Sequence, residues 1–163
     1  MKICVFPGSF DPFTLGHLDV VRRAAKIFDK VYVAVMVNSA KQGHFTPAER
    51  KQIADISCVG INGVEVITAD GMLVDLCRAL GACAIVKGIR NGTDLDYEMM
   101  QAGVNKYFDE GLETVFLPTS AKYSFICSAF VRELIKYGRP FDDVLHPAAV
   151  DLITCNFKDK LVH

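Results

Sequence analysis

Residues 2–17 read KICVFPGSFDPFTLGH, and this stretch decides the fold. Residues 2–6 are apolar at consecutive positions, which is typical of a strand covered on both faces of a parallel sheet. From Leu18 to Phe28, apolar side chains recur every three or four positions, which predicts an amphipathic helix. A buried strand, a tight turn and a helix form the first part of a βαβ unit.

The same alternation continues along the chain. Four further apolar runs predict strands at residues 31–37, 64–68, 82–86 and 114–118. Helical patterns lie between and after them, beginning at Thr46 and covering about 72–80, 94–108, 128–137 and 147–157. With right-handed crossovers, this order predicts an α/β fold: a Rossmann-like, doubly wound parallel sheet of five strands, in a single domain over residues 1–163.

Composition excludes several classes of protein. With 51% hydrophobic and 23% charged residues, the chain is globular, and a net charge of -1 gives no overall field that would attract nucleic acid. No window approaches the roughly 18 apolar residues of a membrane span, and the N-terminal apolar run is too short for a signal peptide. The six cysteines form no CxxC pair. We therefore expect a soluble, cytoplasmic protein with reduced thiols that binds neither nucleic acid nor membranes.

Cationic residues follow several of the predicted strands. In an open parallel sheet, ligands bind beyond the carboxyl ends of the strands. Lys41, Lys87, Arg90 and Lys122 all lie in such segments. Any one polar loop is most simply a solvated loop, but four cations in three loops on one edge favour a phosphate-binding site.

The turn GSFDPFTLGH at residues 8–17 is the best candidate for that site. A helix N-terminus offers unpaired N–H groups to an anion, and Gly16 leaves room for a ligand near the backbone. Thr14 and His17 lie three positions apart, so they share a face of the first helical turn. His17 could donate a hydrogen bond to a phosphate oxygen, but a capping Thr14 and a surface histidine are equally simple interpretations. The glycine spacing is not that of a dinucleotide-binding GxGxxG motif.

Residues 14–17, TLGH, resemble the (H/T)-x-G-H signature of the nucleotidyltransferase superfamily. Three further segments resemble the bacterial phosphopantetheine adenylyltransferase family, in the same order and spacing: NSAKQGHFTPAER (38–50), VKGIRNGTDLDYEMMQAGVNK (86–106) and FLPTSAKYSFICSAFVRELIKYG (116–138). The resemblance covers nearly the whole chain. It implies transfer of the adenylyl group of ATP to 4′-phosphopantetheine, giving dephospho-CoA and pyrophosphate. Mg²⁺ would assist, the protein would be a homohexamer, and CoA feedback would be conceivable.

The resemblance also implies site residues. The catalytic ones would be His17, Lys41 and Arg90. The phosphopantetheine site would contain Ser9, Lys41, Leu73 and Lys87. The ATP site would contain Ser9, Phe10, His17, Gly88, Ile89, Arg90, Glu98, Tyr123, Ser124, Phe125, Ile126, Cys127, Ser128 and Ala129. No metal ligand is assigned. Lys87 stands where the family often has Arg, and Cys127 and Ala129 replace serines, so two hydroxyls are missing.

The chemistry agrees with this set of residues. A phosphate monoester is largely a dianion at neutral pH, so it needs no general base to attack another phosphate. The candidate site accordingly contains cations and one histidine but no Ser-His-Asp set. Two rivals stay open: another nucleotidyltransferase, such as a nicotinamide-nucleotide adenylyltransferase or a glycerol-phosphate cytidylyltransferase, and a regulatory module that binds nucleotide without turnover.

Other residues have simpler interpretations. Glu98 is equally well explained as a favourable charge near a helix start. Tyr97, Met99 and Met100 are expected to serve packing or an interface. His44, His146 and His163 lack metal-ligand spacing and are expected to be solvated. Arg132 and Glu133 are expected on a solvent-facing helix, with a phosphate contact by Arg132 conceivable.

Overall fold

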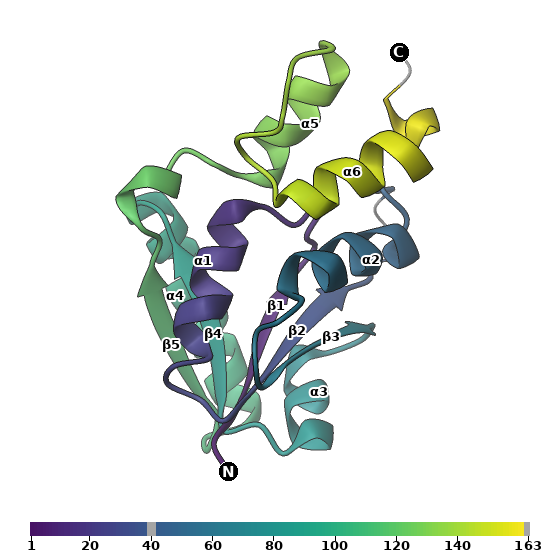
Figure 1. Cartoon of the computed structure of the whole chain (residues 1–163). Helices are drawn as coiled ribbons and strands as arrows, with labels where there is room; N and C mark the ends of the chain where they lie inside the picture. The colour runs from purple at the N-terminus through teal and green to yellow at the C-terminus, as the bar shows by residue number, and fades with distance from the viewer. Residues whose placement is uncertain (39–41, 162–163) are drawn as a thin grey trace.

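The computed structural model describes residues 1–38 and 42–161, and within them the chain forms a parallel sheet of five strands (Figure 1). The strands are β1 (Ile3–Gly8), β2 (Lys30–Met36), β3 (Val64–Ala69), β4 (Ala84–Ile89) and β5 (Glu113–Pro118), in the spatial order β3-β2-β1-β4-β5. The helices are α1 (Leu15–Ala24), α2 (Pro47–Cys58), α3 (Leu73–Leu80), α4 (Gly92–Phe108), α5 (Ser128–Lys136) and α6 (Pro147–Asn156). Two short 3-10 turns, Ala121–Tyr123 and Lys158–Lys160, were not predicted. The predicted doubly wound α/β fold is confirmed.

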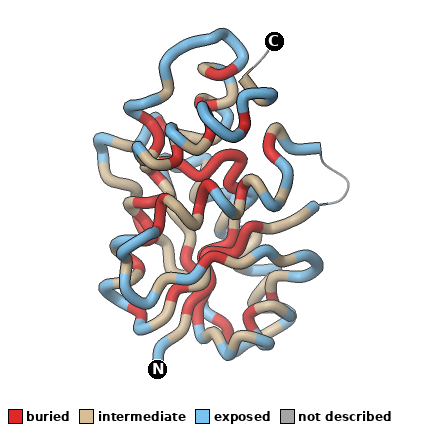
Figure 2. The backbone as a smooth tube through the Cα atoms, turned by 45° about the vertical axis from the view of Figure 1, so that its right-hand side comes forward, coloured by how far each residue is buried: buried red, intermediate tan, exposed pale blue. Residues whose placement is uncertain are grey.

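Consecutive apolar residues in the strands serve two different cores. Cys4 packs with α1, α2, α5 and α6 on one face of the sheet, whereas its neighbour Val5 packs with α3 on the other. The pair Val33 and Ala34 divides in the same way. The buried backbone therefore runs through the middle of the molecule (Figure 2). The edge strands β3 and β5 depart from the expectation of full burial, because each has exposed residues. Strand β4 also departs from the predicted run 82–86, because it covers Ala84–Ile89, so Lys87 lies within the strand and not after it.

Strand β1 ends at Gly8, later than the predicted run 2–6, so Pro7 lies within the strand. A proline removes one N–H from the ladder, so it is normally excluded from a central strand. Here β1 pairs with β2 over its whole length, but it pairs with β4 only at Cys4 and Val5. Beyond Val5 the strands β1 and β4 separate, which accommodates Pro7 and leaves space between their carboxyl ends.

The remaining expectations concern thiols and membranes. All six cysteines lie in the described part of the chain and are free. Burial raises the pKa of Cys4 and Cys58 to about 12 and that of Cys77 to about 11, so these three stay thiols at neutral pH. Cys83 and Cys155 are exposed. Among residues 1–38 and 42–161, each helix is too short or too polar to cross a bilayer.

Candidate active site

A cavity of about 750 Å³ opens where β1 and β4 separate. This volume lies within the roughly 300–1,000 Å³ range of small-molecule sites. Its walls come from the end of β1 and the start of α1, from the end of β4 and the first half of α4, and from Thr119 together with the start of α5. The cavity thus lies at the point where the strand order reverses, beyond the carboxyl ends of the strands, as expected for a doubly wound sheet.

Thr14 is both the cap of α1 and the support of His17. The Thr14 hydroxyl accepts the His17 backbone N–H, and the Thr14 backbone N–H donates to His17 Nδ1 at 3.0 Å. Because a backbone N–H can only donate, Nδ1 must be the unprotonated nitrogen of the neutral ring, and the proton lies on Nε2. His17 lines the cavity, so its ring offers a hydrogen-bond donor.

Three phenylalanines enclose the His17 ring. The ring centroids of Phe6, Phe10 and Phe13 lie 6.3, 5.0 and 5.4 Å from that of His17. Burial, followed by the charge of Arg90, lowers the pKa of His17 to about 4. The imidazole is therefore neutral at physiological pH, in agreement with the tautomer that the Thr14 contact selects.

This pKa predicts a pH-dependent stability. The unfolded chain binds a proton at His17 below about pH 6.5, whereas the folded chain does so only near pH 4, so the free energy of unfolding falls as the pH drops through this window. The full loss attributable to His17 is roughly 3 kcal/mol. Urea unfolding of the wild type and of His17→Gln at several pH values from 4 to 8 measures it as the difference between the two curves. Parallel curves would show that His17 is not held neutral by the fold.

The turn before His17 has a strained backbone that the aromatic cluster holds. Phe10 has a φ of 47°, in the left-handed region that a bulky residue rarely adopts. A Cβ atom at Gly8 would lie 2.7 Å from the Phe10 ring, so position 8 must be glycine for the ring to pack there. Such strain often marks a functional site, where neighbouring contacts impose the conformation.

Buried polar side chains fix the same turn from the β2 side. Arg50, on α2, is buried and donates to the carbonyl oxygens of Ser9 at 2.7 Å and Met36 at 3.2 Å. The buried Asp11 carboxylate accepts the backbone N–H groups of residues 44 and 45, each at 2.8 Å. These contacts therefore join the turn to residues 44 and 45 and to α2.

Helix α5 fixes the turn from the opposite side. Arg132 donates to the Asp11 carbonyl oxygen at 2.6 Å, and the Ser128 hydroxyl donates to the Pro12 carbonyl oxygen at 2.8 Å. Arg132 also lines the cavity, so its expected place on a solvent-facing helix surface was wrong, while Glu133 is exposed as expected. Cys127 takes the capping role of a serine, because its Sγ accepts the Phe130 N–H at 3.4 Å.

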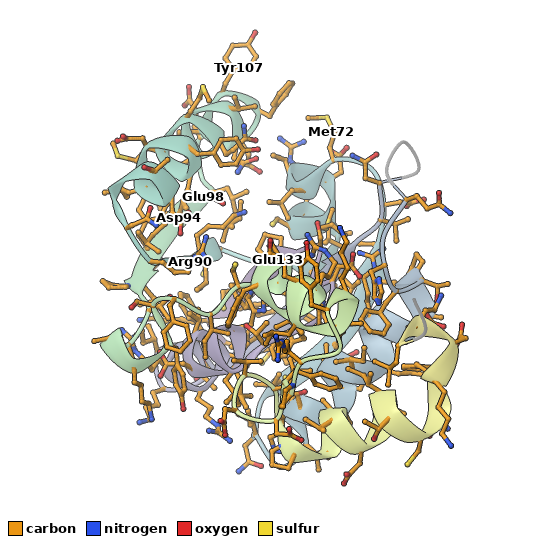
Figure 3. The ribbon with its side chains drawn as sticks, turned by 90° about the horizontal axis from the view of Figure 1, so that it is seen from above. Met72, Arg90, Asp94, Glu98, Tyr107 and Glu133 are labelled. Atoms are coloured by element: carbon orange, nitrogen blue, oxygen red, sulfur yellow. The ribbon has the colours of Figure 1, made fainter. Side chains whose placement is uncertain are left out.

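The cations at the end of β4 are paired with carboxylates of α4. Arg90 donates to Asp94 through Nε at 2.9 Å and Nη2 at 3.1 Å. Lys87 Nζ lies 3.1 Å from Glu98 Oε2, close enough for a charge pair but without hydrogen-bond geometry. Arg90, Asp94 and Glu98 gather on the same side of α4, whereas Tyr107 points away from the molecule (Figure 3). Lys87 and Arg90 therefore lie on the same wall of the cavity, and Arg90 is held by more hydrogen bonds than Lys87.

The segment after β5 is anchored to α1. The Asp19 carboxylate accepts the Ser120 backbone N–H at 3.1 Å and the Ser120 hydroxyl at 2.9 Å. Burial acts to raise the pKa of Asp19, but the hydrogen bonds from Ser120 and Arg23 outweigh it and lower the pKa. Asp19 is therefore ionised at neutral pH and connects the helix of His17 to the segment 119–127.

The structure brings together most of the predicted site residues. Those that line the cavity are Ser9, Phe10, His17, Lys87, Gly88, Arg90, Glu98, Ile126, Cys127, Ser128 and Ala129. Those outside its lining are Leu73, Ile89, Tyr123, Ser124 and Phe125, while Lys41 lies outside the described residues. Sequence reasoning assigned no part in the site to Thr93, Asp94 or Thr119, which also line the cavity. Of these, the i,i+4 spacing of Arg90 and Asp94 was a usable signal.

Two histidine expectations need correction. His44 and His146 are half-buried, and each has one ring nitrogen that is inaccessible to solvent, so neither is the solvated residue predicted. His146 also occupies the N-cap position of α6. His163 lies outside the described residues. Within residues 1–38 and 42–161, no three His, Cys, Asp or Glu side chains are grouped so that they could hold a metal ion.

Comparisons with known proteins agree with this geometry. The model of the cytidylyltransferase-like family matches residues 5–134. The chain is 40% identical over 160 residues to the phosphopantetheine adenylyltransferase of Lachnoclostridium phytofermentans, with 98% of each chain covered. It is 44% identical over 138 residues to that of Clostridium botulinum, covering 85% of this chain and 87% of the relative.

Solved structures share the fold at low sequence identity. A protein assigned as a nicotinate-nucleotide adenylyltransferase from Vibrio parahaemolyticus matches with a TM-score of 0.71 and 17% identity, over 99% of this chain and 95% of that one. The nicotinic acid mononucleotide adenylyltransferase of Plasmodium falciparum matches with a TM-score of 0.67 and 15% identity, over 97% of both chains. At this identity the likeness shows the architecture alone.

Proposed function

Because the chain belongs to the phosphopantetheine adenylyltransferase family of cytidylyltransferase-like proteins, we propose that it transfers the adenylyl group of ATP to 4′-phosphopantetheine. The products are dephospho-CoA and pyrophosphate. The observation that carries the proposal is one cavity that combines a neutral imidazole donor, two cations at the end of β4 and a helix N-terminus. Each of these groups favours phosphate, and none is a general base.

The reaction needs alignment more than acid–base chemistry. An oxygen of the 4′-phosphate attacks the α-phosphorus of ATP, and the bond from that phosphorus to the oxygen bridging the β-phosphate breaks, so pyrophosphate leaves. Both reactants are anions, and cations must offset their repulsion. His17 donates from Nε2 to the α-phosphate, where negative charge increases in the transition state. A neutral imidazole donates this hydrogen bond without a buried positive charge, which agrees with the burial of His17.

The other residues take roles according to their place on the walls. Lys87, which lines the cavity, binds the 4′-phosphate, and Arg90, which also lines it, contacts the triphosphate. Lys41 lies outside the described residues, and its contact with the 4′-phosphate is proposed from the family resemblance. Backbone N–H groups at the start of α5 bind the terminal phosphates, so the missing hydroxyls at Cys127 and Ala129 matter little. The hydroxyl of Ser128 already donates to Pro12, which leaves its backbone as the ligand.

Magnesium fits this site as a companion of ATP. Both carboxylates that line the cavity, Asp94 and Glu98, are paired with cations, and the described residues form no metal-ligand cluster. Mg²⁺ prefers phosphate oxygens and water to an all-protein cage. When bound to the triphosphate, it would reduce the charge that Arg90 and the α5 N-terminus must neutralise.

The decisive experiment is formation of dephospho-CoA by the purified protein. ATP and CTP are each supplied with 4′-phosphopantetheine, nicotinate mononucleotide or glycerol 3-phosphate, and pyrophosphate release is measured. We expect turnover only with ATP and 4′-phosphopantetheine. Turnover with another pair would assign a different nucleotidyltransferase activity, and tight ATP binding without any turnover would indicate a regulatory module. Adding CoA to the same assay tests feedback inhibition by CoA. We propose a cytoplasmic location, because the reaction consumes ATP.

We also propose that the chain self-associates through α4, as a hexamer. No residue of α4, which lies wholly within the described part, is buried, although the helix has 17 residues. Its exposed apolar side chains away from the cavity are Met99, Met100, Val104, Tyr107 and Phe108, whereas Tyr97, which was expected to serve packing or an interface, lines the cavity. An apolar patch of this size on one helix is typical of an interface. The expectation that the methionines serve an interface fits their exposure better than core packing.

Charge on this surface is therefore expected to disrupt assembly. Met100→Glu combined with Tyr107→Glu places two carboxylates in the buried interface, and we expect the hexamer to dissociate. Light scattering after size-exclusion chromatography gives the mass. Val59→Glu is the matched control, because Val59 is 78% exposed but lies at the end of α2. A wild-type monomer, or a double variant that stays hexameric, would contradict the assignment.

A further inference from the structure

The Arg90–Asp94 pair differs from every other ion pair in the described part of the chain. Asp94 accepts two side-chain hydrogen bonds from Arg90, at Nε and Nη2, and lies 3.3 Å from the Arg90 backbone N–H. One carboxylate thus holds both ends of the same residue. A bidentate contact of this kind fixes the rotation of the guanidinium plane as well as its position.

Asp94 is itself well fixed. Its backbone N–H donates to the side chain of Asn91, the N-cap of α4, at 2.9 Å. Its side chain and that of Arg90 are 25% and 32% exposed, so water screens the pair only in part. Pairing with Asp94 offsets the burial of Arg90 and raises its pKa, and the nearby Cys127 side chain acts in the same direction. Arg90, which lies between β4 and α4, is therefore close to the start of α5, and its charge lowers the pKa of His17.

The neighbouring pair provides a contrast. Lys87 and Glu98 have one charge contact without hydrogen-bond geometry. A lysine ammonium is also free to rotate, whereas the arginine fork is planar. A ligand can therefore attract Lys87 away from Glu98 readily, but Arg90 keeps its place through two hydrogen bonds and its third nitrogen, Nη1, is outside the contact with Asp94.

We propose that Asp94 is a positioning residue that holds the Arg90 guanidinium ready for the triphosphate before ATP binds. The proposal rests on the proposed function, because Arg90 must act on a phosphate for its position to matter. An ordered arginine loses less side-chain entropy when the transition state forms. The opposite effect would follow if Asp94 competed with the phosphates for Arg90, since removal of the carboxylate would then increase activity.

Steady-state kinetics of Asp94→Ala, Asp94→Asn and Arg90→Ala, alone and combined, distinguish these effects. We expect Asp94→Ala to lower kcat/KM for ATP about tenfold, an entropic effect of the size of ordering one long side chain. Asp94→Asn, which keeps one acceptor oxygen, should lower kcat/KM for ATP about threefold on the same grounds. In the Arg90→Ala background, Asp94→Ala should change kcat/KM for ATP by less than about twofold, because the group it positions is gone.

The control is Asp55→Ala, which removes another i,i+4 carboxylate, paired with Lys51 on α2. It should leave kcat/KM for ATP unchanged. Thermal unfolding of each variant separates loss of fold from loss of positioning. If Asp94→Ala does not fold, Asp94→Asn is used for the same comparison. Equal fold-losses with and without Arg90, or an increase in kcat/KM for ATP, would overturn the proposal. A wild type that forms no dephospho-CoA would instead refute the proposed function.

Discussion

Replacement of His17 by alanine should lower kcat by about 100- to 1,000-fold, the size of effect expected when one transition-state hydrogen-bond donor is removed. The KM for ATP should change by less than about threefold, since the donor gains most of its strength only as charge increases on the α-phosphate. Steady-state kinetics with 4′-phosphopantetheine saturating, together with calorimetric binding of ATP, measure the two quantities separately.

Thr14→Ala is the matched control for this experiment. It removes the capping hydroxyl but keeps the backbone N–H that donates to His17 Nδ1, so the tautomer survives. We expect a stability loss of about 1 kcal/mol, as for other N-caps, and a much smaller loss of kcat than in His17→Ala. Equal loss of kcat and ATP affinity in His17→Ala would show that His17 binds the ground state and not the transition state.

The sequence was sufficient for the fold because its strongest signals are local. Runs such as VYVAVMV predict strands that are covered on both faces, and the two cores that meet at Val33 and Ala34 are the physical reason for the pattern. The extension of β1 beyond residue 6, through Pro7, was not predicted, and the reason is non-local. The acceptance of Pro7 in β1 depends on the separation of β1 from β4, which no pattern within β1 reveals.

Site residues that follow a strand could be predicted from the sequence, whereas those on the face of a helix could not. His17, Lys87 and Arg90 follow from the rule that ligands bind at the carboxyl ends of strands. Arg132 was expected on a solvent-facing surface, because only the tertiary structure brings the start of α5 against Asp11. The same holds for Asp19, whose partner Ser120 is 101 positions away in the sequence.

Substitution of Lys87, which is proposed to bind the phosphate of the acceptor substrate, should have the second large effect on activity. Lys87→Met should raise the KM for 4′-phosphopantetheine by about 30- to 100-fold, because a charge-assisted contact to phosphate is lost and such contacts contribute about 1.5–3 kcal/mol. The KM for ATP should change little. Lys87→Arg should stay near wild type, since the family often has arginine here and the charge is kept. Varying each substrate at saturation of the other gives both constants.

A double variant shows how much of the affinity lost in Lys87→Met comes from the unpaired charge of Glu98. In Lys87→Met, Glu98 keeps its carboxylate in the cavity without the ammonium 3.1 Å away, so it repels the incoming phosphate. Adding Glu98→Gln removes that repulsion, and we expect it to recover about three- to tenfold of the lost affinity. No recovery would show that repulsion by Glu98 does not contribute to the loss of affinity. A rise in the KM for ATP in place of that for 4′-phosphopantetheine would show that Lys87 binds the nucleotide, and the proposed roles of Lys87 and Arg90 would then be exchanged.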